Sequence, residues 1–295
     1  MSLHFVALGD STTVGVGDPL GGKEVSRTGA GALPGEGWRG WAALLAQALG
    51  SSQPVTFENL SKTGATAPLV AGDQLPAAGA GRIDLASLIV GVNDTMRSTF
   101  DPLQIRDSLH EVAAELTRRG ALLLTVRFHD HGRVFGLPTW LRRPLWRRIE
   151  LVNAAYDDVY AAYGGIRVDL ADCPEVYHRD FWSVDRLHPG ERGHRQLARA
   201  FADKLAARGV PIADPPSLDC DAQSPPNPWG DAVWMIREGA PWVGRRARDL
   251  APWAARMAVS EARTTFRRLT PDRVAERFEP QHALEPDPGL NHSAA

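Results

Sequence analysis

The sequence predicts an α/β protein with a mostly parallel sheet, and two observations support this class. Short apolar runs alternate with longer amphipathic runs from Leu3 to about Lys204, which is the pattern of βαβ units. Helix start and stop residues also fall at the ends of the longer runs. The 295 residues allow one such domain and an extension beyond it.

The strands and helices are expected in alternation. The apolar runs predict five strands, at residues 4–8, 55–60, 85–90, 121–126 and 166–170. The amphipathic runs predict helices at residues 37–49, 101–119, 144–163 and 189–208. The helix at 101–119 has the clearest limits, since Asp101 is a natural N-cap, Pro102 suits the first helical position and Gly120 follows its end.

The chain after this region changes in composition. A domain is expected over residues 1–208, and a proline-rich linker over 209–228, because proline is poorly tolerated in helices and central strands. Residues 229–279 hold ten arginines, no lysine and seven acidic residues, together with several tryptophans, and are expected to form a helical extension. Its apolar stripe either lies at a membrane surface or packs against protein, and the interleaved acids favour packing. Residues 280–295 are expected to be a disordered tail.

Composition excludes some partners. A formal net charge of -2 gives no general attraction to nucleic acid or to acidic membranes. The N-terminus lacks the features of a secretory signal and no run of about 18 apolar residues occurs, so a cytoplasmic location is expected unless a leader was trimmed. The two cysteines, Cys173 and Cys220, form neither a disulfide framework nor a zinc motif, although one bridge between them is open.

The first predicted strand leads into FVALGDSTTVGVGDP, residues 5–19, where Ser11 is a nucleophile, part of a phosphate loop or a turn residue. The glycines miss the dinucleotide-binding spacing, because Leu20 stands where the third glycine belongs. A nearly complete P-loop also fails, since Glu24 follows Lys23 where magnesium binding needs Ser or Thr. Nucleotide binding is therefore disfavoured.

A nucleophile needs a base, a group that orients the base and donors for the oxyanion. The stretch DRLHPGERGH, residues 185–194, places Asp185 three positions before His188, where the acid is able to bond the second ring nitrogen of the base. Gly64 and Asn93 follow the second and third predicted strands. Parallel sheets collect functional residues at the carboxyl ends of their strands, so these groups are expected to line one crevice with Ser11.

The four segments together resemble the SGNH or GDSL hydrolases, which are named for this Ser, Gly, Asn and His. The matches run in the family's order through Gly9-Asp10-Ser11, Gly64, Gly91-Val92-Asn93-Asp94 and Asp185-Arg186-Leu187-His188, and the resemblance covers roughly residues 3–208. It implies a three-layer α/β/α flavodoxin-like fold with a parallel five-stranded sheet. It also implies hydrolysis of a carboxylic ester through an acyl-enzyme, without metal or cofactor.

By this resemblance Ser11 is the nucleophile, His188 the general base and Asp185 the residue that orients it. The backbone N–H groups of Ser11 and Gly64 and the side-chain amide of Asn93 form the oxyanion hole. The substrate is then a small-molecule, glycan or lipid ester. Thr12 departs from the family, which usually has a bulky apolar residue there, and with Thr13 it favours a short acyl or acetyl group.

Other interpretations stay open beside this one. In one alternative the protein is a metal-dependent phosphoesterase, with the segment His129-Asp130-His131, Asp185 and His188 as metal ligands. A loop is the simpler interpretation of that segment. In a second alternative the protein is a binding module that has the same fold but does not catalyse a reaction. The aromatic residues that follow, Phe135, Trp140 and Trp146, suggest a lid or an acyl-pocket wall.

Three further polar residues are expected to have structural roles. Asp10 and Asp94 are expected to hold their turns by accepting hydrogen bonds from backbone N–H groups. His194, six residues past His188 in the same predicted helix, is expected on the surface.

Overall fold

The computed structural model describes residues 2–20, 37–220 and 259. The residues predicted to form the second half of the linker, the helical extension and the C-terminal tail lie almost wholly outside this part of the chain. The prediction of a separate extension therefore stays a prediction. Residues 209–220 of the predicted linker are described and contain no helix or strand.

The centre of the protein is a parallel five-stranded sheet in the order β2-β1-β3-β4-β5. The strands are β1 (Leu3–Gly9), β2 (Val55–Asn59), β3 (Leu85–Ile89), β4 (Leu122–Arg127) and β5 (Ile166–Asp169). β3 is buried at every position and β1 at its last five, as expected for strands covered by helices on both faces. The predicted strands are confirmed, with ends that shift by at most one residue.

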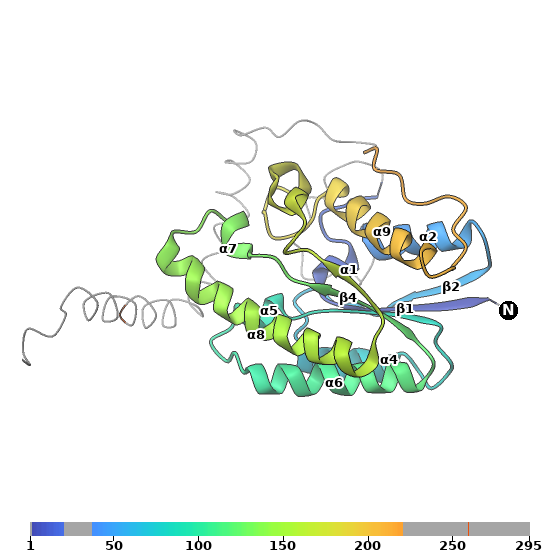
Figure 1. Cartoon of the computed structure of the whole chain (residues 1–295), viewed down its shortest axis with the longest axis horizontal. Coiled ribbons are helices and arrows are strands. Elements are labelled where there is room, and N and C mark those ends of the chain that lie inside the picture. Colours follow the sequence, from blue (N-terminus) through green and yellow to red (C-terminus); the bar gives the residue numbers. More distant parts are fainter. Residues whose placement is uncertain (1, 21–36, 221–258, 260–295) are drawn as a thin grey trace, which may run out of the picture.

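Helices cover both faces of the sheet and complete a three-layer α/β/α fold (Figure 1). One face carries α2 (Gly40–Gly50) and α9 (Glu191–Ala206), which pack on each other. The opposite face carries α6 (Pro102–Arg118) and α8 (Thr139–Tyr163). A single large apolar core fills the space between these layers.

Two predicted helix starts are wrong for local reasons. The helix expected from residue 37 begins at Gly40, because Trp38 forms a bridge with Pro19 and the N–H of Arg39 donates to the Asp18 carbonyl. The helix expected from residue 144 begins at Thr139, with Pro144 inside it. The carbonyl of Pro138 accepts from the N–H groups of residues 141 and 142, which closes a first turn ahead of Pro144.

Short helical segments that the sequence analysis did not predict follow several strands. α1 (Ser11–Val14), α5 (Val92–Thr95) and α7 (His131–Val134) come after β1, β3 and β4. Between β2 and β3 the chain forms α3 (Ala67–Leu69), a π-helical turn over Val70–Gln74, and α4 (Leu75–Ala77). These segments carry or support most of the candidate site.

Candidate active site

Ser11 is the first residue of α1 and lies directly after β1. The Asp10 side chain caps this helix by accepting from the Thr12 N–H at 3.0 Å, which confirms the expected structural role of Asp10. Ser11 is 93% buried, so its hydroxyl faces a protein environment. The turn therefore holds the Ser11 hydroxyl at the carboxyl end of a central strand, as predicted.

A chain of hydrogen bonds joins Ser11, His188 and Asp185. His188 Nε2 lies 2.8 Å from Ser11 Oγ, and His188 Nδ1 lies 2.5 Å from Asp185 Oδ2. Because a carboxylate only accepts, Nδ1 carries the proton and Nε2 accepts from the serine hydroxyl when the ring is neutral. This tautomer is the one that can take a proton from Ser11.

The other carboxylate oxygen of Asp185 accepts three hydrogen bonds. Its Oδ1 accepts from Ser183 Oγ at 2.6 Å, from the Leu187 N–H at 2.9 Å and from the His188 N–H at 3.0 Å. Ser183 was not predicted, because a serine two residues before an acid is common in ordinary turns. These three donors fix the carboxylate plane against the imidazole.

The two partners shift each other's pKa in opposite directions. Burial by itself raises the pKa of Asp185, but the positive charge of His188 and the hydrogen bonds outweigh burial and hold that pKa well below its usual range. Burial by itself lowers the pKa of His188, but the Asp185 carboxylate, with a smaller contribution from Asp10, raises it above its usual value. Asp185 therefore stays ionised and favours the protonated imidazole.

The Gly64 loop lies beside the Ser11 turn. The N–H of Lys62 donates to the Gly9 carbonyl at 3.3 Å, which ties this loop to the end of β1. Asn93 Nδ2 donates to the Ala65 carbonyl at 3.0 Å, so the Asn93 amide keeps a second hydrogen for another acceptor. Gly64 has a φ of 78°, which favours glycine, and open space on its Cβ side.

Asp94 bonds to a neighbouring loop rather than to its own turn. Both carboxylate oxygens accept from the Ala67 N–H, at 3.2 and 3.3 Å. Burial raises the pKa of Asp94 to about 7, and burial raises that of Asp10 to about 6. Asp94 therefore accepts a hydrogen bond from a backbone N–H, as predicted, but this N–H belongs to the loop that carries Gly64.

Polar side chains from helices hold the carboxyl ends of three strands. Gln74 accepts from the Gly9 N–H and donates to the Gly9 carbonyl, both within 2.9 Å. Tyr156 bonds both backbone groups of Val90, and Asn153 bonds both backbone groups of Phe128. None of these three was predicted, because nothing in their local sequence marks a partner more than 20 residues away.

His194 is buried, so its predicted surface position is wrong. Its Nδ1 accepts from the Trp41 N–H at 3.2 Å, and its Nε2 therefore donates to the Val16 carbonyl at 3.0 Å. Burial lowers the pKa of His194 to about 4. The residue connects α9 to α2 and to the loop after Ser11, which turns this face of the helix inward.

His129 and His131 stack on each other with their ring centroids 4.0 Å apart, and both are buried. Burial lowers the pKa of both, that of His131 to about 4. Asp130 caps α7 and pairs with Arg142 of α8 at 2.6 Å. Within the described ranges, no group of three or more His, Cys, Asp or Glu side chains gathers that could hold a metal ion.

The three aromatic residues suggested as a lid have different surroundings. Phe135 lies beside His131, with ring centroids 6.4 Å apart, and Trp146 packs against the main core. Trp140 is 49% exposed.

Cys173 and Cys220 are both free thiols. None of the described helices is both long and apolar enough to cross a membrane.

The fold and the site together define an α/β protein with a Ser-His-Asp arrangement at the carboxyl edge of its sheet. A model of the GDSL-like lipase/acylhydrolase family matches residues 7–196. The chain belongs to this family, whose members include esterases and lipases, and the predicted family and fold class are confirmed. No curated protein matches the sequence.

Solved structures with this fold include several esterases. TesA is 21% identical, with a TM-score of 0.50, covering 69% of this chain and 98% of its own. A lipase/acylhydrolase from Enterococcus faecalis is 18% identical, with a TM-score of 0.50, covering 70% and 96%. A mutant of Axe2, an acetyl-xylooligosaccharide esterase from Geobacillus, is 16% identical, with a TM-score of 0.51, covering 76% and 97%. At these identities the likeness establishes the fold alone.

Proposed function

We propose that this protein hydrolyses a carboxylic ester through an acyl-enzyme on Ser11. The observation that carries the proposal is the continuous hydrogen-bonded chain from Ser11 Oγ through His188 to Asp185. A serine hydroxyl is a weak nucleophile unless a base takes its proton, and a base needs an oriented ring. All three parts of this arrangement are in bonding contact.

The proposed reaction has two stages, acylation of Ser11 and hydrolysis of the acyl-enzyme. Ser11 Oγ attacks the ester carbonyl while His188 Nε2 takes the hydroxyl proton, and Asp185 stabilises the imidazolium that forms. The tetrahedral oxyanion accepts hydrogen bonds from the N–H groups of Ser11 and Gly64 and from the Asn93 amide. The alcohol leaves as its bond to the carbonyl carbon breaks, taking the proton from His188. Water then attacks the acyl group in the same way and releases the acid.

The substrate class is proposed on narrower grounds. Thr12, next to the nucleophile, is partly buried and polar where the family usually has a bulky apolar residue, which favours a short acyl or acetyl group. One structural neighbour is named an acetyl-xylooligosaccharide esterase, which agrees with this preference. We propose an acetyl or short-chain ester of a small molecule, glycan or lipid.

Activity on a panel of p-nitrophenyl esters from acetate to palmitate tests the proposal. Wild type is expected to cleave acetate or butyrate with the highest kcat/KM. Ser11→Ala is expected to lose at least about 10³-fold in kcat, because no nucleophile remains. Undiminished activity of Ser11→Ala contradicts the nucleophile, and a maximum at long chains contradicts the short-acyl preference.

A further inference from the structure

Three side chains from one short segment hold the loop that carries Gly64. Asn93 donates to the Ala65 carbonyl and Asp94 accepts from the Ala67 N–H, as described above. Arg97 completes the set, because its Nη2 donates to the carbonyl of Gly64 itself at 3.2 Å. The proposed oxyanion loop is therefore held in place by the segment after β3.

Gly64 is held by hydrogen bonds on both sides of the peptide that follows it, because the Ala65 N–H donates to the Lys62 carbonyl at 3.1 Å and the Gly64 carbonyl accepts from Arg97. It has a φ of 78° and no atom within 4 Å of the position where a Cβ would stand. A glycine with open space around it has a wide choice of backbone angles, and no packed side chain restricts them. The Gly64 N–H belongs to the preceding peptide, so a hydrogen bond to the Gly64 carbonyl acts on this N–H indirectly: it fixes the peptide that joins Gly64 to Ala65 and thereby the position of the Gly64 Cα.

Arg97 is well placed to supply this restraint. Its own N–H donates to the Asp94 carbonyl at 3.1 Å, and its carbonyl accepts from Arg148 Nη1 of α8 at 2.8 Å. Arg148 also stacks over the Phe100 ring, 4.8 Å from its centroid. The backbone of Arg97 is thus fixed from two sides before its side chain reaches the Gly64 loop.

The guanidinium of Arg97 forms no salt bridge with a carboxylate among the described residues, and its Nε is buried without a hydrogen-bond partner. Its charge acts on the Asp94 carboxyl nearby, where it opposes the rise in pKa caused by burial. A positive charge in partly buried surroundings interacts with a nearby developing anion more strongly than it does in water. The charge therefore favours negative charge accumulating near Gly64.

We propose that Arg97 is a positioning residue for the oxyanion hole: through the Gly64 carbonyl it fixes the peptide after Gly64, which supports the position of the Gly64 N–H, and it adds positive charge beside that residue. This inference rests on the proposed ester hydrolysis at Ser11. Both effects act on the tetrahedral intermediate more than on the bound ester. Loss of Arg97 therefore lowers kcat and leaves KM nearly unchanged.

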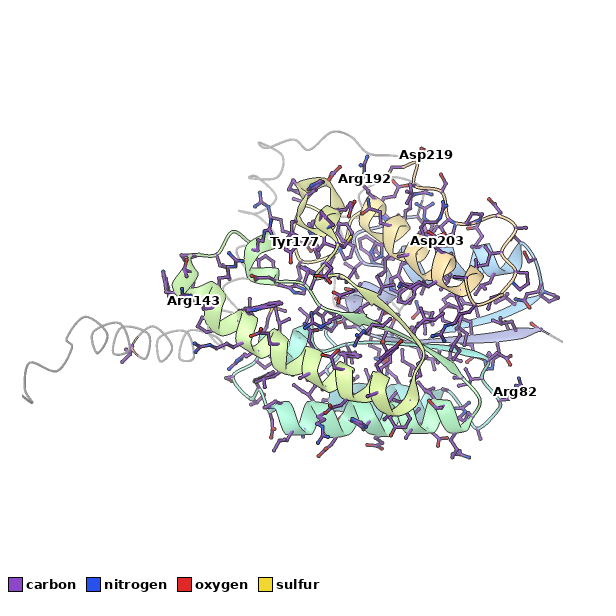
Figure 2. The ribbon with its side chains drawn as sticks, in the orientation of Figure 1. Arg82, Arg143, Tyr177, Arg192, Asp203 and Asp219 are labelled. Carbon is purple, nitrogen blue, oxygen red and sulfur yellow. The ribbon has the colours of Figure 1, made fainter. Side chains whose placement is uncertain are left out.

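The test compares Arg97→Met, Arg97→Lys and a control, Arg82→Met, on the best p-nitrophenyl ester. Arg82 has a 79% exposed side chain and precedes β3, whereas Arg97 follows it, and Figure 2 shows Arg82 at the right-hand side of the molecule. Arg97→Met is expected to lower kcat roughly 10- to 100-fold with KM within about threefold, since one direct oxyanion donor is worth somewhat more. Arg97→Lys keeps the charge without the planar fork and is expected to fall between Arg97→Met and wild type. The control is expected to match wild type.

Two readouts separate positioning from a merely structural role. Titration of reactive sites with diethyl p-nitrophenyl phosphate counts folded, competent molecules, and the expected loss is in kcat per titrated site. The Ki of a boronic acid, which forms a tetrahedral anion on the serine, is expected to rise in proportion to the loss of kcat/KM. An unchanged kcat per titrated site, or an unchanged boronate Ki, overturns the role of Arg97 even if the melting temperature falls.

The same measurements on Ser11→Ala separate this inference from the function on which it rests. If Ser11→Ala is inactive while Arg97→Met keeps the wild-type kcat, only the role of Arg97 is overturned. If Ser11→Ala is fully active, both the nucleophile and the oxyanion role of Arg97 fall. If Arg97→Met yields no folded protein, Arg97→Gln decides, since this variant removes the charge and shortens the side chain: wild-type kcat per titrated site and boronate Ki in it contradict the role of Arg97.

Discussion

Gly17 lies directly against the backbone carbonyl of Pro189. A Cβ added to Gly17 would stand 2.1 Å from that oxygen, far inside van der Waals contact. Gly17 belongs to the loop that follows Ser11, and Pro189 follows His188. The two loops that carry the proposed nucleophile and base therefore pack backbone to backbone, at a distance that only glycine permits.

Gly17→Ala is expected to push these loops apart and to lower kcat at least about tenfold, because small misplacements of reacting groups are costly. It also places alanine at a φ of 103°, which adds about 1 to 2 kcal/mol of backbone strain. Gly209→Ala is the matched control, with a φ of 83° and nothing near the added Cβ. The measurements are kcat and the free energy of unfolding. Equal effects of the two substitutions contradict the importance of the contact with Pro189.

Asp185→Asn is expected to lower kcat by roughly 10²- to 10⁴-fold with little change in KM. The amide presents a donor toward His188 Nδ1, or loses the charge that favours imidazolium, so the ring no longer takes the serine proton efficiently. Asp180→Asn is the control, because Asp180 lies five residues earlier and pairs with Arg192 at 3.1 Å. Steady-state kinetics check the prediction, and a kcat for Asp185→Asn within threefold of wild type would refute it.

Asp10→Asn is expected to move the acidic limb of the activity profile to lower pH. The charge of Asp10 contributes to raising the pKa of His188, and the neutral side chain removes that contribution. Asparagine still accepts from the Thr12 N–H, so the helix cap remains. The measurement is kcat/KM against pH. Asp94→Asn serves as the control and is expected to leave the limb in place.

His194→Gln is expected to reduce the loss of stability in acid. A buried histidine with a pKa lowered to about 4 binds its proton more weakly in the folded state than in the unfolded chain, near 6.5. Its contribution is fully present above pH 6.5 and is lost as pH falls toward 4, on the order of 3 kcal/mol. Urea unfolding at several pH values measures this slope. His178→Gln, at an exposed histidine, is the control, and equal slopes for both variants contradict the assignment.

The alternation of short apolar runs with longer amphipathic runs was enough to predict the fold class and the positions of the five strands. That Ser11 and His188 come together was also predictable, because Ser11, Gly64, Asn93 and His188 occur in one order and each follows or precedes a regular element. Helix starts were less predictable. The turn ahead of Pro144 depends on the Pro138 carbonyl, and the start of α2 depends on contacts of residues 38 and 39 with the Ser11 loop.

Residues that hold the site were not predictable from local patterns. Gln74 sits in a π-helical turn and bonds Gly9, 65 residues away, while Arg97 reaches Gly64 across 33 residues. Glutamine and arginine are both common on protein surfaces, so neither residue stands out in the sequence. His194 was misplaced for the same reason, since its burial results from α2 packing on α9.

The sequence by itself determined the elements and the chemistry they offer, because hydrophobic periodicity, caps and short motifs are local properties of a chain. Tertiary structure decided which groups meet. Ser11 and His188 are 177 residues apart, and only the parallel sheet, whose strand ends share one edge, brings their atoms to 2.8 Å. The same folding of the chain brought Gln74 to Gly9 and Arg97 to Gly64, because hydrogen bonds depend on distance in space and not on separation along the sequence.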